Sequence, residues 1–268
     1  MVVYVVLYFL TALLFGPLLA WLLDYLAGNV AAILLCALAT NWLTLRIYEN
    51  RSVVELGLWW SRVSLDNLLL GLAGGMGSAI LVLVPPMMAG AAHLTPVAGA
   101  SATAGTVMFV VAMLAAGAAG EELFFRGYGF QILVAHLGEW ATILPVGIAF
   151  AALHSGNPNA NWFGLANTAG FGVLFGYAYV RSRDLWLPIG LHFGWNLTFP
   201  LLGVNLSGLR INVTGYEMSW TAGKLWSGGE YGPEASILTS VVLFVLAAYV
   251  VKAPVRRQSS PLTGPPLE

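Results

Sequence analysis

Long apolar runs separated by short polar stretches make up most of the chain, from its first residues to about residue 251. A helix that crosses a bilayer needs roughly 20 apolar residues. By that length the pattern predicts an all-α polytopic membrane protein, a bundle of about eight transmembrane helices. The predicted spans are residues 3–26, 29–47, 67–90, 105–134, 139–156, 162–180, 185–204 and 234–251.

The polar stretches between these runs differ in kind. Residues 48–66 (YENRSVVELGLWWSRVSLD) are too charged to span, and we expect an amphipathic surface segment with its tryptophans at the membrane interface. Residues 205–232 are expected to form a long loop rich in Gly, Trp and Tyr. We therefore expect one transmembrane domain over residues 1–251. A basic and then Pro-rich tail, residues 252–268, is expected to be disordered and cytoplasmic.

Composition agrees with a bilayer location and excludes several other classes of protein. Of the 268 residues, 59% are hydrophobic and 9% are charged, and the mean hydropathy is +0.80. A soluble domain carries about 25% charged residues. The net charge of −1 argues against nucleic acid as a partner, because phosphate binding needs clustered Lys and Arg. Cys36 is the only cysteine, which excludes disulfide frameworks and zinc sites built from cysteines.

The placement of Lys and Arg predicts the orientation of the chain, because cytoplasmic loops carry an excess of both. Basic residues follow the second, sixth and eighth predicted spans: Arg46, Arg51, Arg62, Arg181, Arg183, Lys252, Arg256 and Arg257. These places fall on one side of the bilayer, and we expect both termini in the cytoplasm. The outer loop at residues 205–232 carries two basic residues, Arg210 and Lys224, balanced by Glu217 and Glu230.

Three charged residues interrupt the fourth predicted span, in the sequence GAAGEELFFRGYGF. A charge at the centre of a spanning helix costs roughly 2.5–3.5 kcal/mol, so these side chains must be paired or face the interior. Glu122 and Arg126 are four residues apart on one helix face, and we expect them to form an ion pair. Glu121 is rotated by about 100° and has no such partner, which makes it a candidate for chemistry. Elsewhere in the spans, Asp24 and Asn41 are expected only to form hydrogen bonds between helices.

Two further spans carry polar residues on one helix face. The fifth ends in FAALHSGN, which places His154 one turn after Phe150. The seventh reads LWLPIGLHFGWNL, which places Asn196 one turn after His192. Each of these polar groups is costly when it faces lipid. We therefore expect them to converge, together with Glu121, on one interior cavity.

Such a set supports two kinds of acyl-bond hydrolysis, and the sequence does not choose between them. In one, Glu121 is a general base toward water, one histidine orients that water, and the other histidine and Asn196 donate to the oxyanion. In the other, Glu121, His154 and His192 are the ligands of an open divalent metal site such as zinc, which lowers the pKa of bound water to about 7. We thus expect either no cofactor or one divalent metal. The sequence contains no HExxH, GxGD or GxSG motif, and neighbours such as His154 and Ser155 point apart on a helix, which disfavours a serine dyad.

Three motifs, in this order and spacing, resemble the type II CAAX prenyl endopeptidase family, also called the CPBP or Abi family of intramembrane proteases. They are GEELFFRG (EExxxR), FAALH (FxxxH) and LHFGWN (HxxxN). The segment GGEYGPEAS also resembles one that precedes the last helix in many bacterial members. The resemblance covers about residues 105–240, with the catalytic core at about 105–204, and it implies an eight-helix bundle.

The resemblance also implies a role for each motif residue. The implied site residues are Glu121, Glu122, Arg126, His154, His192 and Asn196. Glu121 and His154 would activate the water, His192 and Asn196 would hold the oxyanion, and the remaining pair would shape the site. Eukaryotic members cut behind a prenylated cysteine, whereas many bacterial relatives have no known prenylated substrate. The family has been described both as metallopeptidases and as glutamate-dependent peptidases.

We therefore predict an intramembrane endopeptidase, multi-pass in a bacterial inner membrane, that hydrolyses a peptide bond in a membrane-associated protein or peptide, prenylated or not. One alternative is a non-catalytic membrane scaffold or immunity protein that binds a peptide partner in the same cavity. A second is a proton-coupled transporter in which the Glu and His residues are proton relays. Retained activity of a Glu121→Gln variant favours the scaffold, and solute flux in proteoliposomes favours the transporter.

Overall fold

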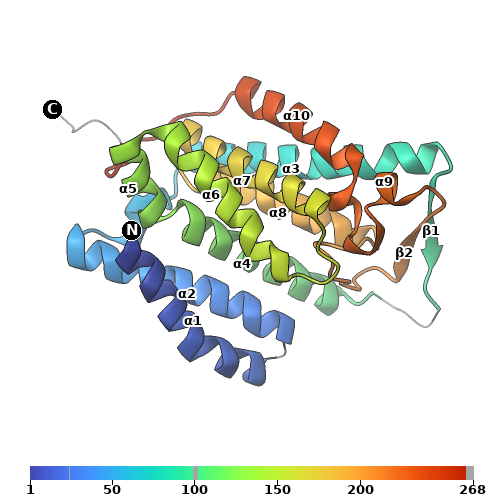
Figure 1. The fold of residues 1–268 in the computed structure, drawn as a ribbon, viewed down its shortest axis with the longest axis horizontal. Helices are drawn as coiled ribbons and strands as arrows, with labels where there is room; N and C mark the ends of the chain where they lie inside the picture. Colours follow the sequence, from blue (N-terminus) through green and yellow to red (C-terminus); the bar gives the residue numbers. More distant parts are fainter. Residues whose placement is uncertain (24, 99–101, 264–268) are drawn as a thin grey trace.

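The chain folds into a helix bundle (Figure 1), seen in a computed structural model that describes residues 1–23, 25–98 and 102–263. The structure is 73% helical, which confirms the predicted all-α class. The α-helices of this part are α1 (Val2–Leu22), α2 (Tyr25–Tyr48), α3 (Arg62–Met88), α4 (Ala104–Arg126), α5 (Tyr128–Leu137), α6 (Glu139–Leu153), α7 (Trp162–Ser182), α8 (Trp186–Leu201), α9 (Lys224–Ser227) and α10 (Ile237–Lys252). Short 3₁₀ helices are η1 (Val53–Leu56), η2 (His154–Gly156), η3 (Gly229–Tyr231) and η4 (Pro233–Ala235), and the strands are β1 (Ala92–Pro96) and β2 (Tyr216–Trp220).

Each predicted span overlaps at least one of the described helices, and the chain is a polytopic membrane protein. In the described residues, four helical segments are long and apolar enough to cross a membrane: α1, α2, α3 and the run from α4 through α5. The helices α6, α8 and α10 are apolar but shorter, with 15, 16 and 16 residues. The total number of crossings therefore stays a prediction.

The predicted fourth span is divided into α4 and α5 at Gly127, and Asn41 of α2 explains the break. Oδ1 of Asn41 accepts a hydrogen bond from the backbone N–H of Tyr128 at 2.8 Å, and its Nδ2 donates to the carbonyl of Leu123 at 3.0 Å. A Cβ at Gly127 would lie 2.3 Å from Oδ1 of Asn41, so only glycine fits there. The hydrogen bonds between helices predicted for Asn41 are confirmed, whereas Asp24 lies outside the described residues.

Helix α8, which carries His192 and Asn196, is held against α3 by glycines on both helices. This glycine seam consists of Gly71, Gly75, Gly190 and Gly194. A Cβ at Gly75 would lie 2.2 Å from the carbonyl oxygen of Leu191, and one at Gly190 would lie 2.5 Å from that of Leu68. Small residues four apart allow such close backbone approach between membrane helices. The seam therefore fixes the position of α8.

We expect Gly75→Ala to separate α3 from α8 and to lower the stability of the protein by about 1–3 kcal/mol, the usual cost of overpacking. The matched control is Gly77→Ala on the same helix, where an added Cβ meets nothing within 4 Å. Thermal unfolding in detergent should show a lower midpoint for Gly75→Ala alone. Equal midpoints for the two variants would contradict the tight seam.

The predicted loop at residues 205–232 is only partly irregular, because β2 pairs with β1. The two strands are antiparallel, with Ala92 opposite Trp220 and Pro96 opposite Tyr216. They lie at the far right of Figure 1, beyond the end of α3. The strands are far apart in sequence, so the chain has no short turn between them from which a hairpin could be predicted.

Residues 253–263, which belong to the predicted tail, lie against the bundle. Nε2 of Gln258 donates to Oδ2 of Asp184 at 2.7 Å, and Oδ1 of Asn67 accepts from the backbone N–H of Arg256 at 3.1 Å. Burial raises the pKa of Asp184, and hydrogen bonds from Asn67 and Gln258 oppose that shift. These contacts satisfy polar groups that the helices bury. Residues 264–268 lie outside the described part.

Candidate active site

The charged motif of α4 lies at the centre of the bundle, where Glu122 and Arg126 are fully buried. Nη1 of Arg126 lies 3.2 Å from Oε1 of Glu122, so the predicted ion pair is confirmed. Nη2 of Arg126 also donates to the carbonyl of Gly172 on α7 at 2.6 Å. Its guanidinium lies 5.2 Å from the ring centroid of Phe150 and 5.6 Å from that of Phe175. Ion pair, backbone carbonyl and aromatic faces together offset the burial of the guanidinium charge.

The same carboxylate of Glu122 holds His192 of α8. Nδ1 of His192 lies 2.9 Å from Oε1 of Glu122, and because a carboxylate only accepts, the imidazole N–H is the donor. The imidazole ring stacks on Phe175 with a centroid distance of 5.0 Å and an interplanar angle of 18°. These contacts fix the ring so that its Nε2 points away from Glu122.

Glu121 lies on the neighbouring face of α4, and its carboxylate faces the Nε2 atoms of two histidines. Its Oε2 lies 3.8 Å from Nε2 of His154 and 3.9 Å from Nε2 of His192. Both distances exceed hydrogen-bond length, and Oε2 is buried with no hydrogen-bond partner in the described part of the chain. Nδ1 of His154 donates to the carbonyl of Phe150 at 2.8 Å, so its Nε2 is also available. Three polar atoms thus face one small space.

The four residues expected to converge, Glu121, His154, His192 and Asn196, all line one cavity of about 430 Å³. Its volume falls in the range of small-molecule and cofactor sites, roughly 300–1,000 Å³. Apolar residues form most of its walls, among them Leu26, Val30, Leu114, Leu206 and Ile211. The structure therefore brings the predicted site residues together, and their catalytic roles stay predictions.

Glu234 of η4 lines the same cavity and was missed among the site residues. Its Oε1 accepts a hydrogen bond from Nε1 of Trp195 at 3.0 Å, and its Oε2 accepts from Oγ of Ser207 at 2.9 Å. Trp195 stands between His192 and Asn196 on α8, so Glu234 connects that helix to the loop over the cavity. The signal was present in GGEYGPEAS, the segment that contains this glutamate.

His93, His136 and Ser155 lie outside the cavity. Oγ of Ser155 donates to the carbonyl of Ala152 at 2.7 Å and is solvent-exposed, as expected for a residue outside a serine dyad. His93 is an exposed residue of β1, and His136 is exposed on α5 with Nδ1 2.9 Å from the carbonyl of Ile132. None of the three lines the cavity.

Charge balance shows what this site can hold. Glu121, Glu122 and Arg126 together leave one negative charge in a mostly buried space. A proton on His192 balances it and gives Nε2 an N–H that can donate to an oxyanion, while a bound cation would balance it with His192 neutral. Two imidazoles and a carboxylate are zinc ligands in kind, but no group of three such side chains in the described residues reaches metal-binding geometry.

Residues 103–198 match the family model of type II CAAX prenyl endopeptidases, described as Rce1-like. The predicted family resemblance is confirmed over this region, which contains all six motif residues and excludes Glu234. At family level the match supports a CAAX-protease-like membrane endopeptidase. No curated protein and no solved structure matches the chain.

Proposed function

We propose that the protein cleaves a peptide bond in a membrane-associated substrate, with a water molecule activated by Glu121 as the nucleophile. The observation that carries this proposal is the position of Oε2 of Glu121, buried and unpartnered, opposite the Nε2 atoms of His154 and His192. The carboxylate is close enough to both imidazoles for one water to contact all three groups. A carboxylate base, two imidazole nitrogens that face it and an adjoining cavity meet the geometric needs of acyl hydrolysis.

The first step is attack of water on the substrate carbonyl. Glu121 takes a proton from the water as its oxygen bonds to the carbonyl carbon, and Nε2 of His154 orients the water. Because the Nδ1 proton of His154 is committed to the carbonyl of Phe150, its Nε2 is held as an acceptor. General-base assistance of this kind contributes typically 10²–10⁴-fold.

The second step is collapse of the tetrahedral intermediate. Protonated His192 donates Nε2–H to the oxyanion, with its Nδ1–H on Glu122, and the side-chain amide of Asn196 is the second donor. Each such donor contributes a factor of roughly 10²–10³ to kcat. The C–N bond then breaks, the proton held by Glu121 passes to the leaving amine, and the new carboxyl group carries the water oxygen.

A metal-assisted form of the same hydrolysis uses the same residues. Glu121, His154 and His192 would hold a divalent ion such as zinc, and the ion would supply a more acidic water. Metal analysis of the purified active protein, with chelator inhibition alongside, separates the two forms. A stoichiometric ion and loss of activity with chelator support the metal form, and full activity of metal-free protein supports the glutamate form.

The proposal is tested by reconstituting the purified chain in proteoliposomes with a library of membrane-anchored peptides. Mass spectrometry is expected to find paired products whose masses sum to that of a substrate plus water. A Glu121→Gln preparation run in parallel should yield none of them. Binding of a peptide without any paired products, in wild type and variant alike, would favour the scaffold function instead.

We expect Glu234→Ala to lower kcat by about 10- to 100-fold, because small displacements of positioned groups carry costs of that size. The alanine leaves Trp195 and Ser207 without their acceptor and releases α8 from the loop. Glu234→Gln keeps one acceptor and should recover part of the loss. The matched control is Glu230→Ala, an exposed glutamate of the same loop.

The Glu234 variants are compared by kcat and KM separately and by thermal unfolding. A positioning role predicts a fall in kcat with the unfolding midpoint little changed and a graded order from wild type through Glu234→Gln to Glu234→Ala. A fall in the midpoint that accounts for the whole loss of active protein would show a purely structural role.

A further inference from the structure

The two ends of the helix bundle differ strongly in charge. Most of the basic residues lie where α2, α7 and α10 end and α3 begins, and we call this the arginine-rich end: Arg46, Arg51, Arg62, Arg181, Arg183, Lys252, Arg256 and Arg257. Contacts between distant segments hold this end together. Nη2 of Arg183 lies 2.8 Å from Oε1 of Glu139 at the start of α6, and Nη2 of Arg181 donates to the carbonyl of Ala253 at 2.8 Å.

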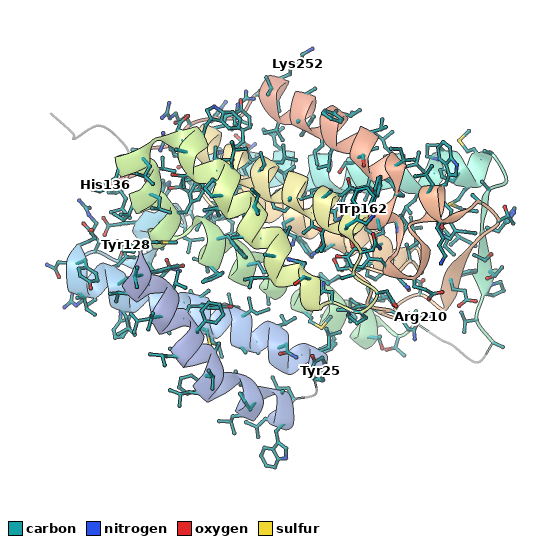
Figure 2. All side chains as sticks on the ribbon, in the orientation of Figure 1. Tyr25, Tyr128, His136, Trp162, Arg210 and Lys252 are labelled. Carbon is teal, nitrogen blue, oxygen red and sulfur yellow. The ribbon has the colours of Figure 1, made fainter. Side chains whose placement is uncertain are left out.

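The opposite end, which we call the loop end, consists of the start of α2, residues 154–161, residues 202–236 and the β1–β2 pair. Its basic residues are Arg210 and Lys224, and Arg210 forms an ion pair with Glu217. In Figure 2, Trp162 and Arg210 lie to the right of Tyr128 and His136, while Lys252 lies at the top and Tyr25 toward the bottom. The basic residues therefore concentrate at one end of the bundle.

The catalytic cavity extends from the site residues toward the loop end alone. On α2 its lining residues are in the first half of the helix, from Tyr25 to Ile33. On α6 and η2 they are Phe150, His154 and Gly156, at the far end from Glu139. The rest of the rim comes from loop residues such as Asn157 and Ser207. Toward the arginine-rich end, the fully buried Glu122 and Arg126 with their aromatic neighbours close the floor.

We infer that the cavity opens on the non-cytoplasmic side of the membrane, and that its substrates are membrane-anchored polypeptides whose scissile bond lies in an apolar segment on that side. The excess of Lys and Arg places the arginine-rich end in the cytoplasm, which leaves the loop end outside. The apolar walls fit hydrophobic side chains around the bond that is cut. The statement about substrates rests on the proposed function, whereas the side on which the cavity opens does not. A lipidated tail in the cytoplasm would meet only the closed floor.

Single cysteines test this inference directly, because the chain has one native cysteine, Cys36, which is buried. In a Cys36→Ala background, Ser207→Cys marks the cavity rim, Ser219→Cys the exposed face of β2, and Ser259→Cys the exposed tail at the arginine-rich end. Asn157→Cys is a second rim position in case Ser207→Cys fails to fold. Spheroplasts that express each full-length variant are treated with a membrane-impermeant maleimide, and detergent-treated samples report total reactivity.

The expected result is labelling of Ser207→Cys, Asn157→Cys and Ser219→Cys in intact spheroplasts, and labelling of Ser259→Cys only after detergent. The reverse pattern would overturn the inference and place the cavity mouth in the cytoplasm. Rim cysteines that react from neither side in folded protein would overturn it as well, because the mouth would then be closed to water. The labelling is independent of peptidase activity, so a failed cleavage assay with the expected labelling refutes only the proposed chemistry.

Discussion

Glu121→Gln is expected to reduce peptide-bond hydrolysis by roughly 10²–10⁴-fold, the contribution of a positioned general base. The substitution keeps the size and shape of the side chain but removes its ability to accept a proton from water. Because Oε2 of Glu121 has no hydrogen-bond partner in the described residues, the amide breaks no existing bond and the fold should persist. Rates are measured in proteoliposomes on a substrate identified by mass spectrometry.

The control for this prediction is Glu230→Gln, which neutralises an exposed carboxylate of η3 that does not line the cavity. Its rate should stay close to that of the wild type. Thermal unfolding of both variants in detergent excludes a general loss of structure. A Glu121→Gln protein that cleaves at the wild-type rate would show that another group deprotonates the water, or that the reaction is not hydrolysis at this site.

Arg126→Met is expected to destabilise the protein by about 3–5 kcal/mol, the usual cost of removing one partner from a buried ion pair. Methionine fills a similar volume but leaves the fully buried carboxylate of Glu122 without its countercharge. The matched control is Arg62→Met, which breaks the ion pair with Asp66 at the same spacing on α3. Since Arg62 is 80% exposed, that loss should be within about 1 kcal/mol.

A double variant separates the cost of a stranded charge from the cost of lost packing. Glu122→Gln with Arg126→Met removes both charges, while the amide oxygen can still accept from Nδ1 of His192. We expect the double variant to unfold at a higher temperature than Arg126→Met alone. If both variants unfold at the same temperature, the destabilisation comes from lost aromatic and backbone contacts of the guanidinium rather than from the unpaired carboxylate.

Length and hydropathy were sufficient to find the helices, because a segment in lipid must satisfy its backbone polar groups internally and does so as an apolar helix. The predicted spans at residues 29–47 and 162–180 match α2 and α7 to within a few residues. The break at Gly127 could not be predicted, because it depends on a side chain from another helix, Asn41. For the same reason the β1–β2 pair and the contacts of residues 253–263 with the bundle were missed: each depends on segments far apart in sequence.

Convergence of the site residues followed from helix periodicity and from the cost of polar groups in lipid. Both arguments apply to Glu121, His154 and His192, which lie on regular helices or directly at a helix end. They do not apply to Glu234, which lies in a short 3₁₀ helix before α10. Its contact with Trp195 becomes visible only once residues 202–236 fold back over the bundle.

The glycine seam between α3 and α8 changes how a genetic screen of this protein should be interpreted. In a library of random substitutions selected for cleavage, codons 71, 75, 190 and 194 should tolerate change as poorly as the codon for Glu121, although these glycines meet only helix backbone and neighbouring side chains. If every position that tolerates no substitution were counted as catalytic, these four glycines would be counted wrongly. Measuring the amount of protein in the membrane for each clone separates substitutions that prevent folding from substitutions that impair only cleavage.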